Sequence, residues 1–112
     1  MAREKEEQVT MGSGNVFADL GLSNPEQRLV KAGLVLQVHN VIEERGLTQV
    51  EVASITGVAQ PKISELLRGK SQGFSTDRLL RMLNKLGKDV DIIVKPMPRD
   101  VSRPARVIVA AG

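Results

Sequence analysis

Few residues in this sequence have the types and spacing that chemistry requires. His39 is the only histidine and the chain has no cysteine, so we expect a surface or half-buried histidine rather than a metal ligand. Asp89 and Asp91 fall on one face of a strand-like segment and could hold a cation, although a solubilising role is the alternative that we favour. Residues 12–14, Gly-Ser-Gly, lack the preceding strand and the lysine of a phosphate-binding loop. We therefore expect no enzyme, no metal site and no cofactor.

The distribution of charge points to binding instead of catalysis. Residues 1–51 hold 5 Lys or Arg and 8 Asp or Glu, a net charge of −3, whereas residues 52–112 hold 11 and 5, a net charge of +6. A basic half favours an anionic partner, and a solvated basic surface without a partner is the alternative. Because the only aromatic residues are two phenylalanines, stacking on single-stranded bases is not expected.

Length and composition predict one soluble domain. The 112 residues are 41% hydrophobic and 26% charged, which is ordinary for a globular protein. The charged start, residues 1–11, is expected to be disordered and has no apolar segment typical of a signal peptide. No apolar run approaches the roughly 20 residues that a membrane helix needs. We expect a cytoplasmic protein without a membrane partner.

Glycines divide the middle of the chain into four predicted helices. The first begins near Asn24 and Pro25 and carries apolar residues with helical spacing up to Arg45. Glycines at positions 46, 57, 69 and 87 then stand where left-handed C-caps are expected. Thr48 can cap the second helix, with Glu51 completing a capping box. The fold class is therefore all-α, a compact helical bundle over residues 25–95, with one additional strand at its C-terminal end.

The strand is predicted by alternation after Gly87. Residues 89–95 place apolar side chains at alternate positions and stop at Pro96. A single strand needs a partner, which is either residues 106–111 or its twin in a second subunit, and we favour the twin. Residues 96–112 form a Pro- and Arg-rich tail. The dimerisation strand is assigned to Val90, Ile92, Ile93 and Val94.

Residues 47–70 predict a helix-turn-helix. Two short helices meet at Gly57, where a tight turn is expected, and Ala53 is small where the helices must approach closely. In such a unit the second helix lies in the major groove of DNA, and its N-terminal residues reach base edges. One shared apolar core is expected from Val52, Ile55, Val58, Ile63 and Leu66.

This stretch resembles the Xre family, the helix-turn-helix class of the lambda and Cro repressors. The resemblance covers about residues 30–87 and rests on Leu47, Thr48, Gln49, Glu51, Ala53, Gly57, Val58, Ile63, Arg68, Gly69 and Lys70. It implies a lambda-repressor-like bundle that binds double-stranded DNA. Because one such monomer has little contact area, we expect a homodimer on a pseudo-palindromic operator.

The family pattern also implies which residues contact DNA. Base reading falls to the surface of the second helix, where Gln60 suits adenine, Lys62 suits guanine or a phosphate, and Glu65 suits cytosine. Glu65 could equally form an ion pair with Lys62 or Arg68. The base-reading set is Gln60, Pro61, Lys62, Ser64 and Glu65, and the phosphate-binding set is Thr48, Gln49, Arg68 and Lys70.

Outside the helix-turn-helix, residues 12–95 resemble the HigA-type antitoxins of bacterial type II toxin–antitoxin modules. The resemblance rests on residues 12–22 of the apolar leader (residues 12–24), on residues 28–34 and 73–87, and on residues 89–94 of the closing strand. It implies a bacterial protein that represses its own operon and binds a small ribonuclease toxin of the HigB/RelE type. A stand-alone repressor and an interaction module without DNA binding are the alternatives. Residues that either strap the bundle or meet a partner are Phe17, Leu20, Leu22, Val35 and Leu36.

Overall fold

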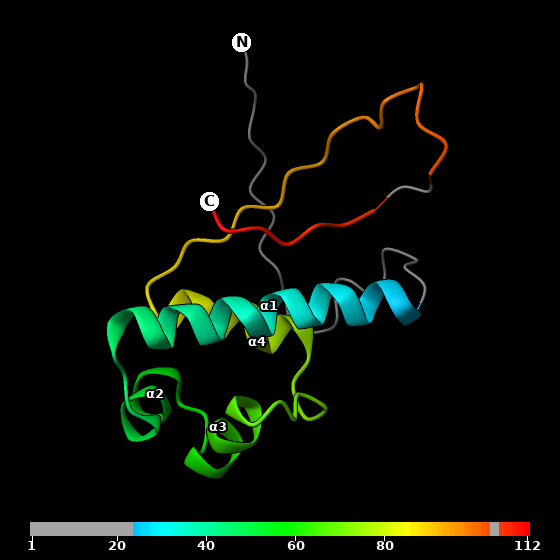
Figure 1. Ribbon diagram of the computed structural model, residues 1–112. Coiled ribbons are helices and arrows are strands. Elements are labelled where there is room, and N and C mark those ends of the chain that lie inside the picture. Colours follow the sequence, from blue (N-terminus) through cyan, green and yellow to red (C-terminus); the bar gives the residue numbers. More distant parts are fainter. Residues whose placement is uncertain (1–23, 104–105) are drawn as a thin grey trace.

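The computed structural model describes residues 24–103 and 106–112 of the chain (Figure 1). Four helices succeed one another within these residues: α1 (Asn24–Arg45), α2 (Gln49–Thr56), α3 (Gln60–Leu67) and α4 (Thr76–Lys85). The predicted four-helix, all-α organisation is confirmed. The predictions for residues 1–11 and for the leader, with Phe17, Leu20 and Leu22, lie outside the described residues.

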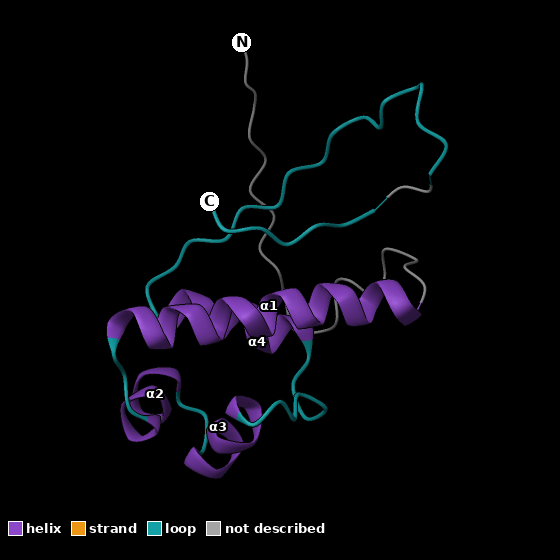
Figure 2. Ribbon diagram, in the orientation of Figure 1, coloured by secondary structure: helices purple, strands orange, loops and turns teal. Residues whose placement is uncertain are grey.

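The helices form two layers. The long helix α1 packs along α4, and the short pair α2 and α3 lies on one side of these two helices (Figure 2). Connections of three residues join α1 to α2 and α2 to α3, so the short helices have little freedom to move apart. The α2–α3 pair is therefore presented on one side of a two-helix support.

The core lies where these layers meet. Apolar residues three or four positions apart turn one face of α1 inward, as helical periodicity requires. The residues of α2 and α3 that face this support, Val52, Ile63 and Leu66, are fully buried. Burial of each such side chain contributes about 1.5–3 kcal/mol relative to exposure. The remaining core residues are Val30, Leu34, Val38, Val41, Ile42, Val58, Phe74, Leu79, Leu80, Met82, Leu83 and Leu86.

A polar tie joins the ends of α1 and α4. Arg45 Nη1 donates to the carbonyl oxygen of Leu86 at 2.8 Å, and Lys88 Nζ lies 3.2 Å from Glu44 Oε1. The Arg45 bond satisfies a carbonyl at the C-terminal end of α4, where intrahelical donors run out. These contacts fix the direction in which the chain leaves α4.

The segment after α4 departs from the prediction. Residues 88–98 are extended but form no strand, so the strand predicted over Val90, Ile92, Ile93 and Val94 is wrong for the single chain. A strand needs a neighbouring backbone to pair with, and residues 106–112, although extended too, form no ladder with this segment. The side chains of Ile93 and Val94 consequently stay 79% and 92% exposed.

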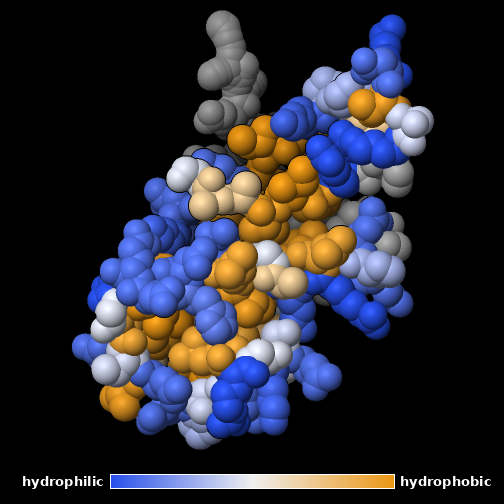
Figure 3. All heavy atoms as spheres, viewed as in Figure 1, coloured by the Kyte–Doolittle hydropathy of each residue, from blue (hydrophilic) through white to orange (hydrophobic). Residues whose placement is uncertain are grey.

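The tail turns back toward the helices. Residues 106–112 run in the reverse direction to residues 88–98 and bring Val109 against α1 (Figure 1). Apolar side chains are visible beside this part of the tail, and a second apolar area lies lower in the same view, toward α2 and α3 (Figure 3). Of the two α1 residues named as possible strap or partner contacts, Val35 is half-buried at the edge of the core and Leu36 is 57% exposed.

Candidate nucleic-acid interface

The turn between α2 and α3 is built as a helix-turn-helix requires. Gly57 has φ 76°, and its amide donates to the carbonyl oxygen of Ala53 at 2.9 Å, which closes the end of α2. A left-handed backbone conformation favours glycine, because glycine has no Cβ that would clash with the neighbouring backbone. Val58 then enters the core, and Pro61 stands in the first turn of α3. Local sequence thus sets the end of α2 and the start of α3.

The N-terminus of α2 carries the predicted capping box. The Glu51 amide donates to Thr48 Oγ1 at 3.1 Å, and the Thr48 amide donates to Glu51 Oε1 at 2.8 Å. The amides of Gln49 and Val50 precede the first intrahelical bond and stand at the positive end of the helix dipole. Because Thr48 is exposed and Gln49 half-buried, this end of α2 is accessible to a phosphate.

The outer surface of α3 is polar and open. Ile63 and Leu66 turn into the core, which leaves Gln60, Pro61 and Glu65 exposed and Ser64 half-buried. The sequence-predicted residues at these four positions therefore share one accessible helix face. An exposed amide and carboxylate can meet the donors and acceptors that base edges present in a major groove.

Two polar contacts organise the C-terminal end of α3. Arg68 Nη1 donates to Ser64 Oγ at 3.2 Å, one helical turn back, and the Lys70 amide donates to the carbonyl oxygen of Glu65 at 2.9 Å. In the described part of the chain Glu65 forms no ion pair with Lys62 or Arg68, the contact that the sequence left open. Its carboxylate is thus available to a partner.

Lys62 lies away from this open face. Its ammonium nitrogen is 5.9 Å from the centroid of the Phe74 ring, within the range of a cation–π contact, and the residue is half-buried. A Cβ on Gly73 would clash with Lys62 Nζ, so the glycine leaves room for the ammonium group. Sequence reasoning placed Lys62 among the base readers, whereas the structure turns it toward the loop between α3 and α4.

Arg78 is a residue that sequence reasoning missed. Its guanidinium carbon lies 4.9 Å from the centroid of the same Phe74 ring, and its Nη1 donates to the carbonyl oxygen of Gly73 at 3.4 Å. The Arg78 amide donates to the N-cap hydroxyl oxygen of Ser75 at 3.1 Å. An arginine four residues after a buried aromatic, at the start of a helix, is the sequence signal that could have found it.

A basic hollow adjoins this loop. It has a volume of about 270 Å³ between the first turns of α1 and the residues that lead into α4. Its lining brings Arg28 and Lys31 of α1 near Phe74 and Ser75. Together with Lys62 and Arg78, these groups extend the positive surface from α3 toward α1. Such a surface suits a phosphate backbone rather than a base edge.

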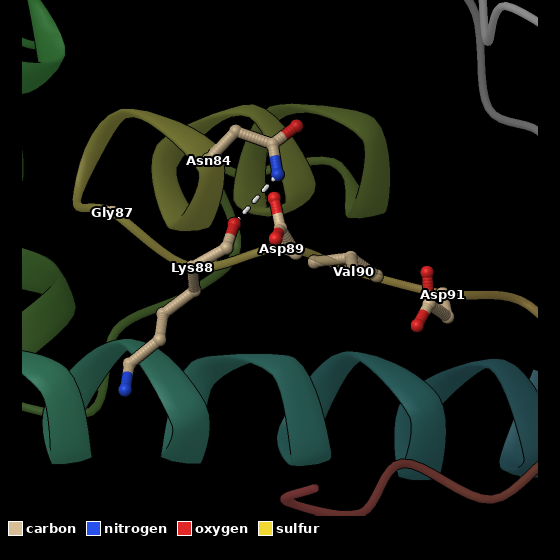
Figure 4. A pocket seen from close by; sticks show the side chains of 6 residues that line it. All are labelled: Asn84, Gly87, Lys88, Asp89, Val90 and Asp91. Carbon is tan, nitrogen blue, oxygen red and sulfur yellow. Dashed lines mark hydrogen bonds between the residues drawn. The ribbon is translucent and has the colours of Figure 1, made fainter.

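The hollow at the exit of α4 carries no comparable arrangement. It measures about 540 Å³ and is lined by Asn84, Gly87, Lys88, Asp89, Val90 and Asp91 (Figure 4). Asn84 Nδ2 donates to the carbonyl oxygen of Lys88 at 2.8 Å. The carboxylates of Asp89 and Asp91 are not directed toward a common point (Figure 4). Among the described residues, no three His, Cys, Asp or Glu come together as a metal site.

His39 is half-buried on α1. None of the helices in the described ranges is long and apolar enough to cross a membrane.

Comparison with known proteins agrees with this geometry. Residues 16–95 match the family described as a helix-turn-helix domain. A solved structure named as a candidate XRE family transcriptional regulator is similar at a TM-score of 0.77 and 37% sequence identity, over 80% of this chain and 100% of that chain. No curated protein matches the chain. The chain therefore belongs to the helix-turn-helix domain family, and within it to the XRE type.

Proposed function

We propose that this protein is a transcriptional regulator that binds double-stranded DNA through α3. The observation that carries the proposal is the polar, accessible face of α3 beside the free amides at the start of α2. The XRE-type structural neighbour, named as a transcriptional regulator, supports the same reading. In this pose α3 enters the major groove while the N-terminus of α2 holds a phosphate.

The residues of the interface divide into two roles. Gln60 and Glu65 read base edges, with Pro61 and Ser64 completing the contact surface of α3. Thr48, Gln49, Arg68 and Lys70 hold the phosphate backbone and fix the register of the helix. Lys62 and Arg78, which both lie near the Phe74 ring, are assigned to the phosphate-binding residues rather than to the base-reading residues. The protein then acts by occupying its site, without catalysis.

The proposed DNA complex contains a homodimer. A single helix-turn-helix buries a small area, and two-fold sites place half-sites about 34–36 Å apart. Support for a dimer comes from Ile92, Ile93 and Val94, which are exposed on an extended segment with unpaired backbone groups. Pairing of this segment with its twin would satisfy those groups and cover the apolar side chains.

The experiment is footprinting of the full chain on the DNA upstream of its own gene. We expect protection of two half-sites separated by about one helical turn, roughly 34–36 Å. Gln60→Ala should raise the protein concentration needed to protect both half-sites and should relax the base preference at one position of each, because a base contact specifies only its own base pair. An exposed residue elsewhere, Asn40→Ala on α1, is the matched control. Uniform protection of unrelated DNA by the native chain would contradict the proposal.

A second candidate function is that of an antitoxin. Leu29 and Leu36 remain 72% and 57% exposed on α1, and an exposed apolar helix surface fits a protein partner. The partner proposed is a small ribonuclease toxin of the HigB/RelE type, encoded beside this gene. We expect co-expression with that neighbour to yield a complex that Leu36→Asp weakens and Asn40→Asp does not. Recovery of only the free protein, with no rescue of growth, would leave a stand-alone regulator.

A further inference from the structure

Gly33 is an unexpected residue for its position. It lies in the interior of the 22-residue helix α1, where glycine is a poor choice because it loses more backbone freedom than alanine does. Its backbone is that of an ordinary helix, unlike the four glycines with positive φ at positions 46, 57, 69 and 87. Backbone conformation therefore gives no reason for a glycine here.

The reason lies in what crosses the helix at this point. A Cβ added to Gly33 would stand 2.7 Å from Val109 Cβ, 3.1 Å from Val109 Cγ2 and 3.3 Å from Val109 Cγ1. The first of these separations is closer than real carbon atoms approach, and the neighbour would have to move. The missing side chain of Gly33 thus makes a notch on α1 into which the valine fits.

Val109 enters this notch alone among its apolar neighbours. It is half-buried and packs against the core, whereas Val107 and Ile108 are 37% and 61% exposed. From residue 107 to the last residue described, the tail carries no charged side chain, so nothing opposes its contact with an apolar helix surface. The contact joins residues far apart in sequence, and residues 88–103 lie on the side of α1 and α4 away from α2 and α3 (Figure 1).

We propose that the surface of α1 around Gly33 is a docking site for the chain's own residues 107–112, with Gly33 as the residue that determines the fit. The chemistry recognised is a short, extended, uncharged chain with a β-branched side chain at its centre. This assignment goes beyond the proposed DNA binding, since the tail lies outside the range 16–95 that matches the family.

The test is a double-mutant cycle on the full chain, read by thermal unfolding. Gly33→Ala improves helix propensity, which by itself should raise Tm by about 4 °C or more. With the tail docked, we expect the opposite sign, a lower Tm, because the added methyl group displaces Val109. In the Val109→Gly background the same change should raise Tm, since the notch is then empty. Ala32→Gly, at the exposed position beside it, should lower Tm equally in both backgrounds.

A second readout keeps the test independent of stability. Trypsin can cleave after Arg106, next to the docked residues, and docking should slow that cleavage. We expect Gly33→Ala and Val109→Asp each to speed cleavage at Arg106 several-fold, while Ala32→Gly does not. Should Gly33→Ala fail to fold, Val109→Asp carries the test alone. The docking site would be refuted if Gly33→Ala raised Tm by the same amount in the native and the Val109→Gly backgrounds. It would also be refuted if Val109→Asp left the rate of cleavage at Arg106 unchanged.

Discussion

The ammonium group of Lys62 lies 5.9 Å from the centre of the Phe74 ring, so a cation of α3 lies within cation–π range of a buried aromatic residue. Arg78 takes a second position over the same ring at 4.9 Å. Each such contact contributes about 0.5–1 kcal/mol at an exposed site and more where water is excluded. This arrangement links the stability of the α3–α4 loop to the positive surface that DNA would meet.

Lys62 should therefore act on affinity rather than on sequence preference. Because its ammonium group faces the loop, Lys62→Ala is expected to weaken binding to all DNA sequences by a similar factor and to lower the salt slope by about one unit or less. The measurement is a titration against a panel of single-base operator variants. A relaxed preference at one base position, with a loss of about 1–3 kcal/mol there, would show that the side chain leaves Phe74 to read a base.

Gln60, unlike Lys62, should act on sequence preference. Its exposed amide stands at the start of α3, where side chains reach base edges. Gln60→Ala is expected to cost about 1–3 kcal/mol on the native operator and to remove discrimination at one position, with the salt slope unchanged. The same variant panel provides the measurement. An equal loss on every sequence would reassign Gln60 to the phosphate-binding set.

Thr48→Ala should lower stability and affinity together. The substitution removes the hydroxyl that accepts from the Glu51 amide, which costs about 0.5–2 kcal/mol of folding free energy. It also disorders the first turn of α2, where a phosphate would bind. Thr48→Ser keeps the hydroxyl and is the matched control. Urea unfolding and DNA titration of both variants give the two quantities, and an unaltered affinity for Thr48→Ala would exclude a phosphate site there.

The buried side chain of Ile63 should contribute strongly to the free energy of unfolding, because it holds α3 against the other helices. Ile63 is fully buried between α3 and the support, so Ile63→Ala removes a packed side chain and leaves a cavity. We expect a loss of about 2–5 kcal/mol in the free energy of unfolding, a large share of a typical domain's total. Ile63→Val, which removes one methyl group, should cost about 0.5–1.5 kcal/mol. Equal losses for the two variants would contradict close packing at this residue.

The sequence predicts the helices well because their limits are set locally. Gly57 and Thr48 end and begin α2 through their own backbone and hydroxyl groups, and both are recognisable from residue type and spacing. The exposed positions of α3 follow equally from the burial of Ile63 and Leu66. Four helices and most of the candidate interface could therefore be predicted.

What the sequence did not predict depends on contacts between distant residues. The Lys62 ammonium group lies near the Phe74 ring and close to Gly73, and neither spacing nor residue type reveals that placement. Alternation suggested a strand over residues 89–95, yet a strand exists only beside a partner backbone, which the single chain does not supply. Gly33 has a role only once Val109 has returned to α1. Each of these features is set by tertiary packing.

The most direct test of DNA binding compares the affinity of the full chain for DNA from its own promoter and for a scrambled fragment, over a range of salt. We expect the promoter to be bound about a thousand-fold more tightly than the scrambled fragment, or better. The affinity should fall linearly with salt on logarithmic axes, and the slope for Arg68→Ala should be smaller by about one unit. Equal affinity for the two fragments, or binding that salt does not weaken, would contradict the proposed DNA binding.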